Sequence, residues 1–187
     1  RVRLRLRGLR FRTRDATEVA PAELARIDIC RGAGAGLGLV DPIRGASFAT
    51  LGLLMALRAG ESSRLALALA DETAYTSLAG VRSIRRTEKL LALARSLNAS
   101  CDTPLHRGWA AAASGQAAYY VGRFKDTLGY ARQAEEAWRT GCTGVTWELA
   151  AVASYEGWCL VYLGRMAEVS IRLPGLIAEA ENRGDLF

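Results

Sequence analysis

Four glycines recur along the chain at a constant interval of 42 residues: Gly38, Gly80, Gly122 and Gly164. Each lies between two segments rich in helix-forming residues such as Ala and Leu. A glycine at such a place lets the chain reverse its direction after a helix. Self-similarity with a period of about 20–50 residues is typical of solenoids, in which stacked hairpins bury their apolar faces against one another. The spacing therefore predicts an all-α fold of about four helical hairpins, or eight helices.

The clearest hairpin lies between Thr103 and Thr140, with a tight turn at residues 121–123. Its first half, residues 109–121, consists almost entirely of small and aromatic residues, whereas residues 124–138 are amphipathic. Small residues allow two helices to approach each other closely. We therefore expect this pair to be tightly packed.

Residues that start and stop helices define the other segments. Pro21 and Pro42 suit the first position of a helix. Asp41 suits an N-cap, and so does either Asp102 or Thr103. The expected helices span residues 21–40, 42–59, 62–79, 83–97, 104–121, 124–141, 143–163 and 165–182. Pro174 lies inside the last of them and removes a backbone hydrogen bond, so we expect that helix to be kinked or split in two.

The first 14 residues hold seven arginines and no acidic residue. Removing these seven from the 25 basic residues of the chain leaves 18 against 19 acidic ones, so the net charge of +6 comes from this segment. Alternation of Arg with apolar residues indicates a strand, whereas the helix propensities of Arg and Leu favour the end of a helix that begins upstream. We divide the chain into an Arg-rich remnant at residues 1–20 and a helical-repeat domain at residues 21–187. The arginines either form a solvated face, which we favour, or contact nucleic-acid phosphates or acidic lipid.

Other residue groups give no indication of catalysis. Four scattered cysteines and a single histidine do not supply the clustered ligands of a zinc site. The glycine run at residues 32–38 fits neither the GxGxxG nor the GK[ST] pattern of phosphate-binding loops, and we interpret it as close helix packing. His106 follows Cys101 and Asp102, but this neighbourhood is typical of a capped helix start. We expect no catalytic residue, no metal and no cofactor.

The sequence also bears on the compartment. The uncharged runs are shorter than the roughly 20 apolar residues of a transmembrane helix, and no secretory signal is present. Scattered cysteines without a CxxC pair are typical of small core residues in a reducing compartment. We expect a cytoplasmic protein without a membrane partner, and the sequence does not indicate its oligomeric state.

The hairpin at residues 103–140 resembles a tetratricopeptide (TPR) repeat, in which a small residue, a turn glycine, an aromatic residue and further small residues recur. The matching residues are Gly115, Gly122, Phe124, Ala131 and Ala134. The next unit matches at Gly157, Gly164 and Met166, and departs at Leu173 and Leu176, where small residues are usual. The spacing of 42 residues also exceeds the 34 that are usual in the family. The resemblance covers about residues 61–182 and implies a TPR-like solenoid.

Most of the chain resembles the C-terminal TPR region of large bacterial serine/threonine protein kinases found in myxobacteria and planctomycetes. The most specific segments are VDPIRGASF, at residues 40–48, and CTGVTWEL, at residues 142–149. The kinase motifs HRD and DFG do not occur in the chain. The resemblance implies a regulatory or scaffolding piece of a longer polypeptide, with the kinase domain upstream.

Aromatic residues supply the candidate binding site. By the TPR resemblance, the first helix of each hairpin lines a concave surface, and the candidate residues there are Trp109, Gln116, Tyr119, Tyr120, Trp158 and Tyr162. Tyr and Trp combine an apolar body with a polar group, which suits recognition of a peptide or small effector. The alternative is that these rings fill the space between stacked hairpins. We expect a protein or peptide partner, or the kinase or ATPase modules of the same polypeptide. The rival hypothesis is a sensory domain of a transcription regulator that contacts nucleic acid through its Arg-rich N-terminus.

Overall fold

The computed structural model describes residues 2–38 and 40–184, apart from the side chains of residues 99 and 100. Within these ranges the secondary structure is helical, and the one β-type contact is an isolated bridge between Arg14 and Glu61. The long helices are α2 (Pro21–Leu37), α3 (Pro42–Ala59), α4 (Ser62–Ser77), α5 (Ile84–Cys101), α6 (Pro104–Tyr119), α7 (Phe124–Gly141), α8 (Thr146–Tyr162) and α9 (Met166–Arg183). Short helices are α1 (Val2–Arg7), η1 (Ala16–Glu18) and η2 (Gly80–Ser83). The all-α prediction is confirmed.

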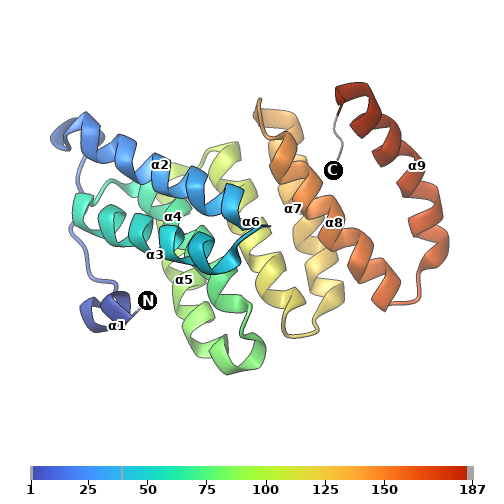
Figure 1. Cartoon of the computed structure of the whole chain (residues 1–187), viewed down its shortest axis with the longest axis horizontal. Helices are drawn as coiled ribbons and strands as arrows, with labels where there is room; N and C mark the ends of the chain where they lie inside the picture. Colours follow the sequence, from blue (N-terminus) through green and yellow to red (C-terminus); the bar gives the residue numbers. More distant parts are fainter. Residues whose placement is uncertain (1, 39, 185–187) are drawn as a thin grey trace.

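The long helices form consecutive antiparallel pairs that lie in a row from α2 and α3 to α8 and α9 (Figure 1). The first helices of the pairs touch in succession, α2 against α4, α4 against α6 and α6 against α8. The second helix of each pair packs on the first helix of the next, as α3 does on α4 and α7 does on α8. This arrangement leaves α9, the last second helix, with α8 as its main neighbour and with no fully buried residue.

Side-chain caps fix several helix starts where the sequence predicted them. The Asp41 carboxylate accepts a hydrogen bond from the backbone N–H of Arg44 at 3.0 Å, and Thr103 caps α6 in the same way. Glu61 also caps α4, by accepting from the backbone N–H groups of Ser63 and Arg64, and this cap was not foreseen. Each cap satisfies amide groups that have no partner within the helix.

The four regularly spaced glycines do not all have the same backbone conformation. Gly80, Gly122 and Gly164 have φ angles of 58°, 78° and 70°, a left-handed conformation that disfavours residues with a Cβ. Gly38 has φ −55° and is right-handed, so its turn does not require glycine for that reason.

One predicted helix end is wrong, and at Pro174 the structure excludes the split helix and agrees with the kinked one. We expected the fourth helix to end near Asn98, but α5 continues to Cys101. Pro174 does not split the last helix: α9 is continuous from Met166 to Arg183, with a bent course in Figure 1. Proline removes one hydrogen bond from a helix without preventing the turns on either side from continuing.

Small residues allow the close approach expected at the central hairpin. A Cβ at Gly108 would overlap the indole of Trp138, and a Cβ at Gly115 would lie 3.1 Å from the Cβ of Tyr130. Trp138 is 1% exposed and packs in a cluster with Ala131 and with neighbouring apolar residues of α6 and α8. Glycine on α6 therefore makes the space that the large α7 indole fills.

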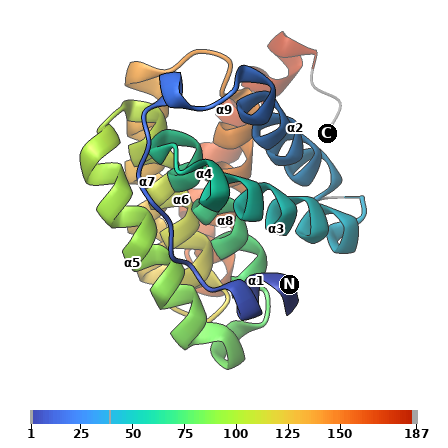
Figure 2. The same ribbon diagram turned by 90° about the vertical axis from the view of Figure 1, so that its left-hand side faces the viewer.

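The Arg-rich N-terminal segment is helical over Val2–Arg7, so the strand interpretation of that stretch is wrong. Leu4 is buried in the main core, and Leu9 and Phe11 pack against the same cluster. The following stretch runs across the end of the helical row, where the Arg14 N–H donates to the Gly60 carbonyl at 2.9 Å (Figure 2). The Arg7 side chain also donates to the Leu57 carbonyl at 3.0 Å, so this segment is held next to α3 and α4.

Candidate functional site

The candidate site is an aromatic cluster where the end of α6, the start of α7 and the face of α8 meet. Tyr119 lies at its centre, and its ring centroid is 5.1 Å from that of Tyr155, 5.3 Å from Tyr120 and 5.7 Å from Phe124. All three pairs are in edge-to-face geometry, the arrangement that the quadrupoles of aromatic rings favour. The tight turn at Gly122 brings the first residue of α7 back against the last turn of α6, and so completes the cluster.

The outer part of the cluster faces solvent. Trp158 and Tyr162 are 51% and 63% exposed. The ring centroid of Trp158 is nevertheless 5.2 Å from that of Tyr155, and Tyr162 stacks on Phe124 with 5.0 Å between the ring centroids and an interplanar angle of 17°. Each of these two rings is thus in contact with another ring of the protein and is also about half or more exposed to solvent. We call Tyr119, Tyr120, Phe124, Tyr155, Trp158 and Tyr162 the aromatic surface.

Polar groups within the aromatic surface are linked by hydrogen bonds. The Gln116 side-chain amide donates to the Tyr155 hydroxyl at 2.8 Å, and the hydroxyls of Tyr155 and Tyr120 are 3.3 Å apart. Burial raises the pKa of Tyr155 far above its usual range, and burial together with Tyr162 raises the pKa of Tyr119 to about 12. Both phenols therefore stay neutral in water near pH 7. The surface offers rings, hydroxyls and an amide, but no charge of its own.

The structure brings five of the six predicted residues together and separates the sixth. Gln116, Tyr119, Tyr120, Trp158 and Tyr162 belong to the aromatic surface or contact it directly. The separated residue lies further back on α6 and is described next.

Trp109 packs edge-to-face on Trp138 at 5.7 Å. The guanidinium carbon of Arg31 lies 5.2 Å from the Trp109 ring centroid, and the Nε of Arg31 is 2.8 Å from the Asp71 carboxylate. Burial raises the pKa of Asp71, and Arg31 acts in the opposite direction. This stacked cation and ion pair links α2, α4 and α6, so Trp109 helps to hold the row of helices together.

Sequence reasoning missed Tyr155, which contacts three other members of the aromatic surface and also Gln116. Its position was available as a signal, because Tyr155 precedes Trp158 by three residues and Tyr162 by seven, the spacing of one helix face. It also missed the ion pairs beside the surface: Glu156 is buried on α8 and accepts from Arg172 of α9 at 2.7 Å.

His106 is a buried titratable side chain outside the aromatic surface. Its Nε2 lies 2.9 Å from the Ser63 hydroxyl and its Nδ1 lies 2.6 Å from the Thr103 hydroxyl, an arrangement that joins the starts of α4 and α6. Burial lowers the pKa of His106, so the ring is neutral near pH 7. A serine–histidine contact resembles half of a hydrolase triad, but here the third group is a hydroxyl rather than a carboxylate. We interpret this group as a helix-to-helix link.

Among residues 2–38 and 40–184, no group of three or more His, Cys, Asp or Glu side chains is placed to hold a metal ion. Across the same part of the chain, none of the helices combines the length and the apolar character that crossing a bilayer demands.

Comparison of the chain with protein-family models, curated proteins and solved structures finds no match.

Proposed function

We propose that this chain is a TPR-like helical-repeat segment that binds a protein or peptide partner through its aromatic surface. The observation that carries the proposal is the pair of supported but exposed rings, Trp158 and Tyr162. Isolated apolar side chains are normal on a protein surface, whereas a contiguous group of large rings marks an interaction site. The succession of first helices α2, α4, α6 and α8 supports a solenoid, the architecture that presents such groups along one face.

The chemistry of the surface suits a largely apolar peptide. Trp and Tyr dominate the binding energy of many interfaces because they bury a large area with few rotatable bonds. Tyr119 and Tyr155 hold their rings in fixed edge-to-face positions, so little conformational entropy is lost when a partner covers Trp158. The Gln116–Tyr155 hydrogen bond fixes an amide and a hydroxyl next to those rings, and these groups can accept or donate to a peptide backbone.

We further propose that the chain is a regulatory part of a serine/threonine kinase, on the strength of its resemblance to the TPR region of such kinases. In this role the aromatic surface transmits occupancy to a kinase domain outside residues 1–187. The mass and domain content of the intact native polypeptide test this part directly. A polypeptide with HRD and DFG motifs upstream supports it, and a mature chain of about this length overturns it.

Binding at the aromatic surface is tested by selecting peptides from a displayed random library on the 187-residue chain. Trp158→Ser and Tyr162→Ser are then compared with Trp147→Ser, a matched control on α8. Trp147 is 46% exposed, close to the 51% of Trp158, but takes no part in the ring contacts of the aromatic surface.

We expect the selected peptides to lose about tenfold or more in affinity with either surface variant and to be unaffected by the control, because central aromatic anchors each contribute at least about 1.4 kcal/mol. Peptides that bind all three variants equally, or a selection that enriches none, would contradict the proposal. Circular dichroism confirms that each variant keeps its helix content.

A further inference from the structure

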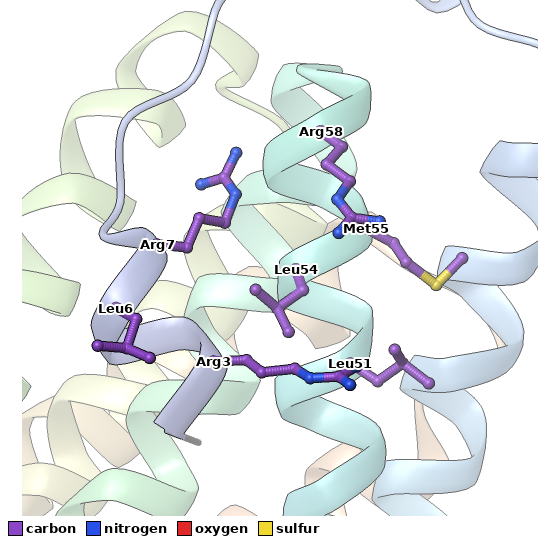
Figure 3. A pocket seen from close by; sticks show the side chains of 7 residues that line it. All are labelled: Arg3, Leu6, Arg7, Leu51, Leu54, Met55 and Arg58. Atoms are coloured by element: carbon purple, nitrogen blue, oxygen red, sulfur yellow. The ribbon is translucent and has the colours of Figure 1, made fainter.

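A cavity of about 550 Å³ lies between α1 and α3, at the end of the helical row that is farther from α8 and its aromatic residues. It is lined by four apolar residues and three arginines: Leu6, Leu51, Leu54, Met55, Arg3, Arg7 and Arg58. In Figure 3, Leu54 projects from α3 toward α1, with Arg3 below it and Arg7 and Arg58 above it. The volume falls in the range of roughly 300–1,000 Å³ that is typical of small-molecule sites.

The floor of the cavity is apolar and fixed. Leu54 and Met55 are half-buried and pack against the main core cluster, so they do not move freely. Leu51 and Leu6 are 46% and 84% exposed and form the edges. An aliphatic chain lying in the cavity would cover all four side chains, and each buried methylene contributes to binding through the hydrophobic effect.

The three arginines differ in whether their side chains already form hydrogen bonds within the protein. Arg7 donates to the backbone carbonyls of Gly8 and Leu57, and so holds α1 against the end of α3. The side chains of Arg3 and Arg58 make no hydrogen bond or ion pair with any residue in the described part of the chain. No acidic residue lines the cavity, so three guanidinium charges surround an apolar floor without compensation.

We propose that this cavity binds a fatty carboxylate: one aliphatic chain on the leucine and methionine floor, with its carboxylate between Arg3 and Arg58. A guanidinium matches a carboxylate with two parallel hydrogen bonds, and these charge-assisted bonds are stronger than neutral ones. The charge selects an anion and the floor selects an aliphatic chain, which excludes inorganic anions and neutral sugars as good ligands.

The size of the site favours a small amphiphile over a macromolecule. A specific protein interface involves about 20–30 residues on each side, whereas seven residues line this cavity. A bilayer contacts protruding side chains, whereas Leu54 lies between α3 and α1 and both Leu54 and Met55 pack against the main core cluster. The proposal is independent of the aromatic surface, so the failure of one does not affect the other.

The test is isothermal titration of the 187-residue chain with sodium decanoate, kept below the concentration at which it forms micelles. The matched ligands are 1-decanol, which lacks the charge, and decyltrimethylammonium, which reverses it. Arg58→Ala and Arg3→Ala are compared with Arg5→Ala, which removes the same charge from α1 at a residue that does not line the cavity.

Leu51→Ser is compared with Leu78→Ser in the same titration, because both leucines are 46% exposed and Leu78 lies at the end of α4. We expect decanoate to bind with a stoichiometry of one and at least tenfold tighter than either matched ligand. Arg58→Ala and Leu51→Ser should each weaken decanoate about tenfold, as expected for loss of a charge-assisted bond or of apolar contact. Arg5→Ala, Leu78→Ser and Trp158→Ser should leave decanoate binding unchanged.

Several results would overturn the proposal. Equal binding of decanoate and decyltrimethylammonium would show that the arginines do not select the ligand. If Arg58→Ala and Arg5→Ala lost the same decanoate affinity, the effect would come from the net charge of the protein and not from the cavity. Binding only to phosphatidylserine vesicles, or salt-sensitive binding of DNA that competes with decanoate, would assign this end of the molecule to a membrane or nucleic acid instead. Circular dichroism of every variant separates a lost site from a lost fold.

Discussion

Arg172 on α9 neutralises a buried carboxylate on α8, and its removal gives a defined test of how α9 is held. The Glu156 side chain is 4% exposed, and its Oε1 lies 2.7 Å from Nη1 of Arg172 and 3.8 Å from Nε of Arg132. Burial raises the pKa of Glu156, and Arg172 is the strongest influence in the opposite direction. The variant Arg172→Met therefore leaves a carboxylate in a poorly solvated place with one more distant cation.

The magnitude follows from the exposure of the pair. Removal of one partner from a fully buried ion pair costs about 3–5 kcal/mol. Arg172 is 36% exposed, so water screens its side of the interaction and we expect a loss of about 2 kcal/mol in the free energy of unfolding at pH 8. A carboxyl group with a raised folded pKa destabilises the folded state when it is ionised, and Arg172→Met raises the pKa of Glu156 further. The cost is therefore largest above that pKa and falls as the pH decreases toward the unfolded value of about 4.3.

The assay is urea unfolding followed by circular dichroism, at pH 8 and pH 5, for wild type, Arg172→Met, Glu156→Gln and the double variant. We expect the double variant to be more stable than Arg172→Met at pH 8, because its uncharged amide no longer needs a cation. Arg165→Met, at the N-cap of α9, is the matched control: it breaks an exposed pair with Glu168 and should reduce the free energy of unfolding by less than about 1 kcal/mol. A cost for Arg172→Met that matches this control, or that is the same at both pH values, would refute the reasoning.

Three further predictions use the same unfolding assay. Trp138→Ala should lower the free energy of unfolding by about 3–5 kcal/mol, because the indole is 1% exposed. Trp147→Ala, at a half-exposed position, should change it by no more than about 0.5 kcal/mol, and equal effects would contradict the packing described for α7. The stability that the neutral His106 ring contributes is present above its unfolded pKa of about 6.5 and is lost as the pH falls through its lowered folded pKa. His106→Gln should therefore flatten the pH dependence of the free energy of unfolding between pH 7 and pH 5. An unchanged pH dependence would exclude a buried neutral ring. Gly122→Ala should cost about 1 kcal/mol because its φ of 78° disfavours a Cβ, whereas Gly129→Ala, inside α7 with open space around it, should gain about 0.5–1 kcal/mol; the same sign for both would refute the backbone argument.

Local sequence signals predicted the helices well because they act within one turn of the chain. Proline and an N-capping side chain define the starts of α3 and α6, and glycines in a left-handed conformation follow α6 and α8. The errors lie where the local signal conflicted with packing. Alternation of Arg and Leu indicated a strand, but residues 2–7 form a helix that places Leu4 in the core. Asn98 indicated the end of a helix, but α5 continues to Cys101.

The candidate site was predicted in part. Tyr119 and Tyr120 are consecutive in the sequence, and Trp158 and Tyr162 are four residues apart on one helix face, so each pair was predictable. Trp109 is separated from this group because it lies earlier on α6 than Tyr119, whereas its actual partner Arg31 comes from a helix that is far away in the sequence. Its ring is held by contacts with α2 and α7, and no property of α6 alone reveals them.

The sequence by itself determined the all-α class, the order of the long helices and most of their starts, because propensity, capping and glycine conformation depend on neighbouring residues. Only the tertiary structure decided which rings meet at Tyr119, that Glu156 is buried against Arg172, and that Arg3 and Arg58 border an apolar cavity. These features join side chains from separate helices. Their distances depend on how the helices pack against one another, and a one-dimensional pattern does not contain that information.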